Sequence, residues 1–210
     1  MPTAQLARSE RTGLCDLLNE LGPEAATLCD GWLTKDLAAH LFVRERRPLA
    51  MPGLLVGGAL AKLTDVSMES ALRSHGYDAL VAKVRSGPPL LARRLDEIVN
   101  LAEFFVHFED VRRAAPAWER RDDPALDSAL WALLGRRGRM LARKVRGAGL
   151  ELERPDGERI VARRAEPRAV LRGGVQDLVL FLCGRDQVAE VVLGGTEEAQ
   201  RSVREAGFRL

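Results

Sequence analysis

Residues 100–113 of the chain are Asn100-Leu101-Ala102-Glu103-Phe104-Phe105-Val106-His107-Phe108-Glu109-Asp110-Val111-Arg112-Arg113. This stretch reads as the middle of a long helix. At about 100° per residue, Glu103, His107 and Asp110 fall within an arc of about 60°. The rest of the circumference carries apolar side chains that can pack, namely Phe104, Phe105, Phe108 and Val111.

This helix offers a carboxylate and an imidazole to one ion. Glu103 and His107 stand one turn apart, so their side chains converge above the turn and suit a single divalent cation. A Glu and a His four residues apart more often form a weak pair on a helix surface. The segment by itself leaves both interpretations open, because a motif needs its structural context to confirm it.

Composition narrows the class of protein. The chain has 210 residues, 46% of them apolar and 30% charged, as in globular proteins with a real core. A net charge of +2 gives no field that demands nucleic acid or a membrane. The sequence has no signal pattern and no apolar run near the roughly 18 residues that span a bilayer. Three scattered cysteines, Cys15, Cys29 and Cys183, predict free thiols. We therefore expect a cytoplasmic protein without nucleic-acid or membrane partners.

The first two thirds of the chain predict a helical bundle. Helices are expected over about 3–21, 35–47, 64–86 with a break near Gly76, 90–115 and 124–145. Thr34 is expected to cap the second helix, with Asp36 in its first turn. The segment 48–63, broken by Pro and Gly, is expected to be a loop. This pattern predicts an all-α bundle of four or five helices.

After Gly147 the pattern changes to short alternating segments. Two of them flank Pro155-Asp156-Gly157 and predict a hairpin. A strand at 168–171, a helix at 174–183, a strand at 190–193 and a helix at 197–206 follow. The predicted fold class is α+β, with a helical domain over 1–146 and a small α+β domain over 147–210.

Three stretches of the sequence resemble a known family. They are Cys29-Asp30-Gly31-Trp32-Leu33-Thr34-Lys35-Asp36-Leu37-Ala38-Ala39-His40-Leu41, the stretch 100–113 quoted above, and Leu178-Val179-Leu180-Phe181-Leu182-Cys183-Gly184-Arg185. Together they resemble the mycothiol-dependent maleylpyruvate isomerase family of the DinB/YfiT-like metalloenzyme superfamily. The resemblance covers nearly the whole chain and implies a DinB-like bundle followed by a sterol-carrier-like domain. It is closer to uncharacterised metal-binding members than to a proven isomerase.

The resemblance also implies a metal site. The family holds its metal with one His from the second helix and a Glu-x-x-x-His pair from the long helix, which correspond here to His40, Glu103 and His107. The commoner superfamily set is three histidines, so Glu103 matches the isomerase branch. Two imidazoles and a carboxylate suit Zn²⁺, with Ni²⁺ or Mn²⁺ as alternatives, and three protein ligands leave an open position.

Each ligating histidine is expected to donate its other N–H to an acceptor. Asp36, one turn before His40, and Asp110, beyond His107, are the candidates for this second layer. For both aspartates, a purely structural role is about as well supported as this second-layer role. Asp36 would be a helix-start charge, and Asp110 would pair with Arg112 or Arg113.

The resemblance further implies a thiol cofactor, mycothiol, and a small electrophilic or anionic substrate. A cation lowers the pKa of a bound thiol, which can then add to a double bond and leave again, or displace a leaving group. These are isomerase and S-transferase chemistry. No nucleophile from the protein is expected, because Cys29 and Cys183 lack a paired His and are predicted to be inert. A non-catalytic protein that binds metal or ligand is the alternative.

Two arginines are candidates for binding the anionic substrate or the thiol. Arg44 follows His40 by one turn, and Arg185 ends the third stretch. A surface role is the commoner one for each. The basic residues between 136 and 146 predict a solvated helix face, and a DNA-binding module is disfavoured. Whether the chain forms a homodimer is left open.

Overall fold

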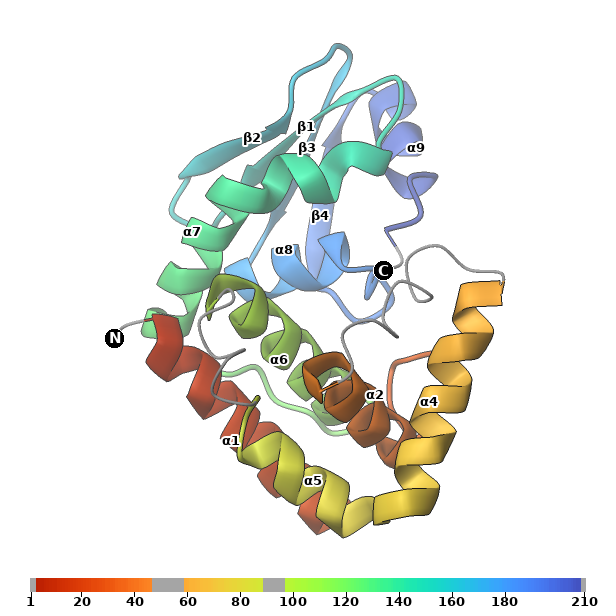
Figure 1. Ribbon diagram of the computed structural model, residues 1–210. Coiled ribbons are helices and arrows are strands. Elements are labelled where there is room, and N and C mark those ends of the chain that lie inside the picture. The colour runs from red at the N-terminus through yellow and green to blue at the C-terminus, as the bar shows by residue number, and fades with distance from the viewer. Residues whose placement is uncertain (1–2, 47–58, 89–96, 209–210) are drawn as a thin grey trace. The chain divides into compact units, whose positions relative to one another are not determined.

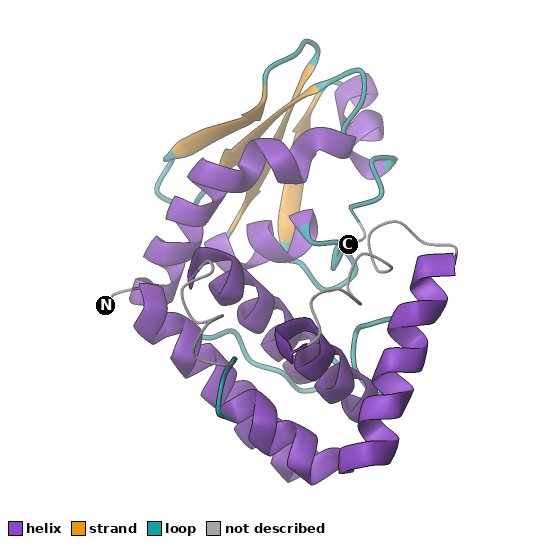
Figure 2. Ribbon diagram, viewed as in Figure 1, coloured by secondary structure: helices purple, strands orange, loops and turns teal. Residues whose placement is uncertain are grey.

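The computed structural model describes residues 3–46, 59–88 and 97–208 (Figure 1). Within these described residues, helices dominate the first part of the chain and the named strands all lie in the second (Figure 2). The chain folds into two compact units, residues 1–120 and 121–210. The α+β class predicted from the sequence is confirmed.

The first unit is built from helices alone in its described part. They are α1 (Thr3–Leu21), α2 (Thr34–Arg46), α4 (Ala59–His75), α5 (Tyr77–Arg85) and α6 (Glu97–Arg112). The expected break at Gly76 is present, with a φ of 75° that favours glycine. The predicted loop is wrong over 59–63, where α4 begins, and its earlier part lies outside the described residues. The expected start of the long helix, 90–96, also lies outside them.

One apolar core holds these helices together. Helix α1 packs along α6, and α2 packs against α4 and α5. Gly13 allows the first contact, because a Cβ there would lie 2.7 Å from Cε1 of Phe108. The core cluster takes side chains from all five helices, including Leu14, Leu18, Leu37, Leu41, Met68, Leu80, Val84 and Phe104. Helices α2 and α6 therefore share the same core, although 50 residues or more separate them in sequence.

The start of α2 differs from the prediction in its capping. The Thr34 hydroxyl donates to the carbonyl of Gly22 at 2.5 Å and does not cap the helix that it begins. The Asp36 carboxylate accepts the Leu33 N–H at 3.0 Å, which is the returning arm of a capping box. Asp36 therefore stabilises the entry into α2.

The second unit combines three α-helices with a sheet. Its elements are α7 (Pro124–Leu141), a short 3₁₀ helix (Ala142–Lys144), β1 (Gly149–Glu153), β2 (Arg159–Arg163), β3 (Arg168–Gly173), α8 (Val175–Leu182), β4 (Val191–Gly195) and α9 (Glu197–Arg204). The strand order is β2-β1-β3-β4. Strand β1 forms the expected hairpin with β2 and pairs in parallel with β3, while β3 and β4 are antiparallel.

Helix α7 groups with the sheet and not with the helical unit. It packs against β2 and α8, and Gly138 brings its backbone close to Ala162. Asp123 caps the helix by accepting the N–H groups of Ala125 and Leu126. The compact units consequently divide after Arg120, whereas the sequence pattern predicted a boundary between 146 and 147. The change from helical to alternating periodicity near residue 147 marks the first strand. The helix before that strand, α7, already belongs to the sheet unit.

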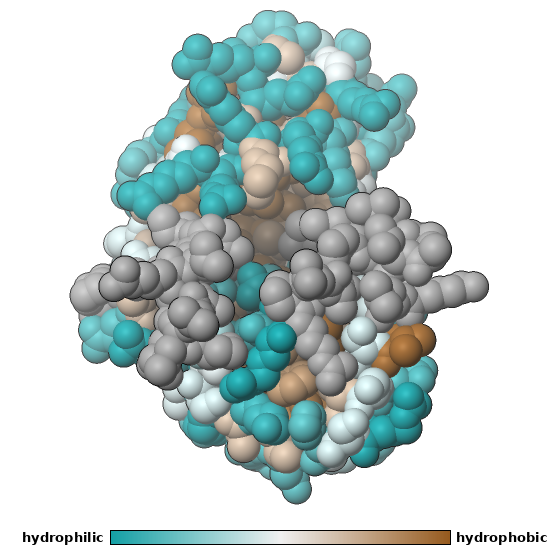
Figure 3. Space-filling model, in the orientation of Figure 1, coloured by the Kyte–Doolittle hydropathy of each residue, from teal (hydrophilic) through white to brown (hydrophobic). Residues whose placement is uncertain are grey.

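The sheet has one covered face and one charged face. Leu150, Leu152, Ala169 and Leu171 are fully buried. On the opposite face, Glu151 and Glu153 form ion pairs with Arg159, Arg168 and Arg172. The surface of this unit that faces the viewer is mostly hydrophilic (Figure 3). Among the helices that the structure describes, none combines the length and apolar character that a membrane crossing needs.

Candidate metal centre

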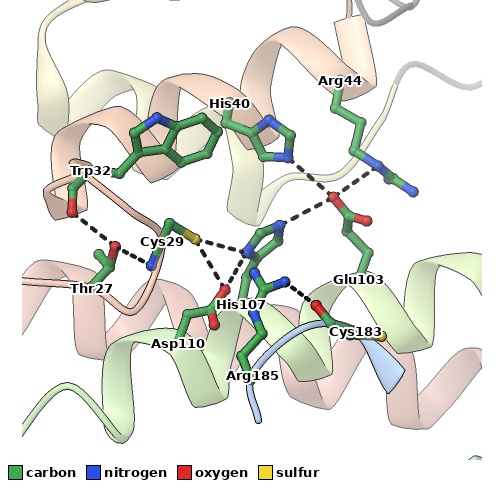
Figure 4. Close-up of polar contacts among 10 residues, drawn as sticks. All are labelled: Thr27, Cys29, Trp32, His40, Arg44, Glu103, His107, Asp110, Cys183 and Arg185. Atoms are coloured by element: carbon green, nitrogen blue, oxygen red, sulfur yellow. Dashed lines mark hydrogen bonds and ion pairs between the residues drawn. The ribbon is translucent and has the colours of Figure 1, made fainter. Parts of the chain in front are cut away.

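Three side chains from two helices converge on one point. Helix α2 carries His40, and α6 carries Glu103 and His107 one turn apart (Figure 4). Nε2 of His40 lies 3.2 Å from Oε1 of Glu103, and Nε2 of His107 lies 3.3 Å from the same oxygen. All three ligand atoms lie within 4.8 Å of one another. The structure thus brings together the three residues that the family resemblance implied.

These separations fit a divalent ion. In a tetrahedral site with ligands about 2.0–2.2 Å from zinc, neighbouring ligand atoms lie about 3.3–3.6 Å apart. Of the two separations, 3.3 Å equals the lower end of that range and 3.2 Å lies 0.1 Å below it. Two imidazoles and one carboxylate are suitable donors for zinc, and a set of three leaves at least one position for another molecule.

Asp110 contacts the ring nitrogen of His107 that does not contact Glu103. Its Oδ2 accepts the Nδ1–H of His107 at 2.9 Å, and the Asp110 side chain is fully buried. This hydrogen bond places the proton on Nδ1, which leaves the lone pair of Nε2 for an ion. The two arginines considered as partners for Asp110, Arg112 and Arg113, both contact Glu109. The contact of Asp110 is thus with His107, and its role behind a metal ligand stays a prediction.

His40 is held differently. The ring is buried, and its Nδ1 has no hydrogen-bond partner within the described residues. Asp36, expected to accept this N–H, binds the backbone of Leu33. The indole of Trp32 covers the ring instead, with centroids 5.1 Å apart and planes at 46°. Packing thus takes the place of the expected hydrogen bond, because the Asp36 carboxylate is used at the start of α2.

Burial and mutual contacts set the protonation of the three side chains. Burial lowers the pKa of His40, although its hydrogen bond to Glu103 opposes this, so the neutral imidazole is favoured. Burial alone would raise the pKa of Glu103, but hydrogen bonds from His107 and His40 hold it well below its usual range. Burial also opposes the charge on His107, yet contacts with Asp110, Cys29 and Glu103 raise its pKa well above the usual value. A bound cation would displace the extra proton of His107.

Arg44 lies beside the three ligands. Its Nε is 3.0 Å from Oε1 of Glu103, and its Nη1 donates to Oδ1 of Asn100 at 3.1 Å. The guanidinium thereby fixes the Glu103 carboxylate from the side. Arg185 belongs to the second unit, where its Nη1 donates to the carbonyl of Cys183 at 2.6 Å. Substrate binding by either arginine remains a prediction.

Sequence reasoning missed two contacts at this centre. Sγ of Cys29 donates to Oδ2 of Asp110 at 3.2 Å and lies 4.0 Å from Nδ1 of His107. The expectation that Cys29 lacks a paired histidine is therefore wrong. The sequence pattern predicted no function for Trp32, whose indole packs on the ring of His40. Both residues belong to the stretch 29–41 that resembles the family, and this membership is the one sequence signal for them. Their contacts with Asp110 and His40 form only in the folded chain.

Comparisons with known proteins support the architecture. No protein-family model and no curated sequence matches the chain. A crystal structure of the mycothiol-dependent maleylpyruvate isomerase is similar to it with a TM-score of 0.62 and 17% identity, over 92% of this chain and 93% of that one. A variant of that isomerase, with one histidine changed to alanine, gives a TM-score of 0.61 and 18% identity over the same shares. The fold implied by the family resemblance is thereby confirmed.

Proposed function

We propose that this protein is a divalent-metal-dependent enzyme that uses a low-molecular-weight thiol to isomerise, or to transfer sulfur to, a small electrophilic or anionic substrate. The convergence of His40, Glu103 and His107 carries this proposal, because separations of 3.2 and 3.3 Å match a tetrahedral ligand set. Zinc is the first candidate ion, and nickel or manganese are the alternatives.

The structural neighbours suggest the thiol. Both are described as mycothiol-dependent maleylpyruvate isomerases. Mycothiol is therefore the first thiol to test, and maleylpyruvate the first substrate. At 17% and 18% identity the substrate of this chain can differ from theirs, which is why the proposal names a class of electrophile.

A divalent ion in this centre supplies positive charge that lowers the pKa of a thiol placed beside it. The chain's own residues do the positioning. His40, Glu103 and His107 hold the ion, and Asp110 keeps Nδ1 of His107 protonated. Arg44 is 18% exposed beside Glu103 and offers a guanidinium to an anionic group of the substrate.

Two reactions are compatible with such a centre. In isomerisation, a carbon–sulfur bond forms as the thiolate adds to the double bond, the remaining single bond rotates, and the same carbon–sulfur bond breaks to return the thiol. In S-transfer, a carbon–sulfur bond forms while the bond to the leaving group breaks, so the thiol is consumed. Thiol consumption therefore separates the two activities.

The decisive experiment has two steps. Elemental analysis of the purified protein is expected to find about one divalent ion per chain. The loaded protein is then assayed with mycothiol and maleylpyruvate, and with activated alkyl electrophiles, while free thiol is measured. Turnover with constant thiol identifies an isomerase, and turnover with equimolar loss of thiol identifies a transferase. Metal without turnover on any electrophile would support a non-catalytic binding protein, and a protein that binds no divalent ion would refute the proposal.

A further inference from the structure

The loop between α1 and α2 is locked by its own hydrogen bonds. The Thr27 hydroxyl donates to the carbonyl of Trp32 at 2.8 Å and accepts the N–H of Cys29 at 3.2 Å. The N–H of Trp32 donates to the carbonyl of Cys29 at 2.9 Å, and an antiparallel bridge joins Ala26 to Leu33. Residues 27–33, hereafter the brace loop, therefore form a defined turn that can hold its side chains in place.

Two hydrogen bonds attach the brace loop to Asp110 of α6. The N–H of Leu28 donates to the backbone carbonyl of Asp110 at 3.0 Å. The thiol of Cys29 donates to Oδ2 of the same residue at 3.2 Å. That oxygen also accepts Nδ1–H of His107 at 2.9 Å (Figure 4). The loop thus fixes both the backbone and the carboxylate of the residue that orients His107.

The same loop also supports the second histidine. Trp32 packs on His40 with ring centroids 5.1 Å apart, and His107 meets His40 edge-on at 5.2 Å. Nδ1 of His40 lacks a hydrogen bond in the part of the chain that the structure describes. The orientation of His40 therefore depends on the contact of its Nε2 with Glu103 and on these ring contacts, of which Trp32 supplies the one that comes from outside the ligand set.

A second ion is the competing explanation for Cys29. Ligand atoms of Cys29, His107 and Asp110 also lie within 4.8 Å of one another. A neutral imidazole, however, has one lone pair, and the short Nδ1–Oδ2 contact uses the Nδ1 proton. An ion between His40, Glu103 and His107 needs the lone pair on Nε2. The two groups therefore compete for His107, and the hydrogen bond to Asp110 favours the group that contains His40.

We propose that the brace loop is the positioning element of the metal centre, in which Cys29 fixes His107 through Asp110 and Trp32 fixes His40. The inference rests on the proposed metal centre and adds to it the residues that hold its two histidines. Cys29 and Trp32 act as positioning residues, and neither binds the ion.

Paired substitutions test the two contacts. Cys29→Ala removes the donor to Asp110, whereas Cys29→Ser keeps an O–H donor. Removal of a second-layer contact typically costs about 10–100-fold in metal affinity, so we expect zinc to leave Cys29→Ala about tenfold faster than wild type. Cys29→Ser should recover at least half of that loss on a logarithmic scale. Trp32→Leu is expected to act like Cys29→Ala, and Trp32→Phe to restore the slower release because it keeps a ring over His40.

A matched control separates this role from general packing. Cys15 is a fully buried thiol of the same unit in α1, a helix that carries none of the three candidate ligands. Cys15→Ala should lower the unfolding temperature but leave the rate of zinc release unchanged. The readout is transfer of zinc to a chromogenic chelator, measured for folded protein below its unfolding temperature.

Cobalt substitution provides the spectroscopic test. Wild type loaded with Co²⁺ should bind about one ion and show no thiolate-to-cobalt charge-transfer band, because Cys29 is not a ligand. In Cys29→Ala the visible bands should shift, since His107 is no longer fixed. A charge-transfer band that disappears in Cys29→Ala, or two ions per chain, would overturn the inference in favour of direct ligation.

The outcomes also separate the two proposals. If wild type binds a divalent ion and both Cys29→Ala and Trp32→Leu release it at the wild-type rate, the positioning role is refuted and the metal centre stands. If wild type binds no divalent ion, both fail. Release that is faster in Cys29→Ala and Trp32→Leu but normal in Cys29→Ser, Trp32→Phe and Cys15→Ala supports the brace loop.

Discussion

Oδ2 of Asp110 lies 2.9 Å from Nδ1 of His107, and the carboxylate is fully buried. This contact determines which nitrogen of His107 faces Glu103 and His40. Helix α6 thus carries both a proposed metal ligand, His107, and the residue that orients it, Asp110, three positions further along.

Removing this acceptor should weaken the metal centre. Asp110→Asn replaces a charged acceptor with a neutral amide, so we expect metal affinity to fall about 10–100-fold, as measured by competition with a chelator. Asp36→Asn is the matched control, because Asp36 lies on α2 and accepts the Leu33 N–H. That change should cost about 1 kcal/mol of stability and leave metal affinity within experimental error. Equal metal affinity in both variants would contradict the role of Asp110.

The two histidines should each be required for metal binding. His40→Ala and His107→Ala each leave two protein ligands, so bound metal in the purified variants should fall to less than about a tenth of the wild-type value. His75→Ala is the control, since His75 is exposed at the end of α4. Elemental analysis compares the three variants, and full occupancy in His40→Ala or His107→Ala would exclude that residue as a ligand.

Arg44 should influence the substrate more than the metal. In Arg44→Ala the three ligands remain, but an anionic substrate loses a charged hydrogen bond worth about 1.5 kcal/mol, which raises KM about tenfold. Arg46→Ala is the matched control from the same helix, because its guanidinium donates to the carbonyls of Lys83 and Gly87. Steady-state kinetics and metal content are measured together. An unchanged KM in Arg44→Ala would remove Arg44 from the substrate site.

Metal removal should lower stability. An ion that binds only the folded chain stabilises it by about 2.7 kcal/mol when its free concentration is 100 times its Kd. Chelation should therefore lower the unfolding temperature of wild type, and zinc should restore it. In His107→Ala the same treatment should have almost no effect. If a chelator leaves the unfolding temperature of wild type unchanged, the folded chain does not bind a stabilising metal ion.

Alkaline pH should destabilise the protein through Cys15. Burial raises the pKa of its thiol from 9.0 to about 11. Between these values the folded state keeps a proton that the unfolded state loses, so the free energy of unfolding falls as pH rises from about 9 to about 11. Two pH units correspond to a loss of about 3 kcal/mol.

Denaturant titrations at several pH values measure this slope, which Cys15→Ala should reduce. Tyr77→Phe is the comparison, because burial raises the pKa of Tyr77 to about 12 and its contribution begins only near pH 10. An identical slope in wild type and Cys15→Ala between pH 9 and 10 would refute the prediction.

Local spacing in the sequence determined much of this structure. The period of α6 placed Glu103 and His107 one turn apart, and Pro155-Asp156-Gly157 marked the hairpin of β1 and β2. Both are properties of neighbouring residues, because helix and turn geometry repeat over a few positions. The family resemblance implied His40 as a third, distant ligand.

Tertiary structure alone decided the rest. His40 and Glu103 are 63 residues apart, and Cys29 and Asp110 are 81 apart, so no periodicity predicts their contacts. The use of Asp36 at the start of α2, the packing of Trp32 on His40 and the grouping of α7 with the sheet also depend on how whole elements pack. Such contacts form only after the chain between distant segments closes into a loop. Packing of the shared core then determines which side chains come into contact.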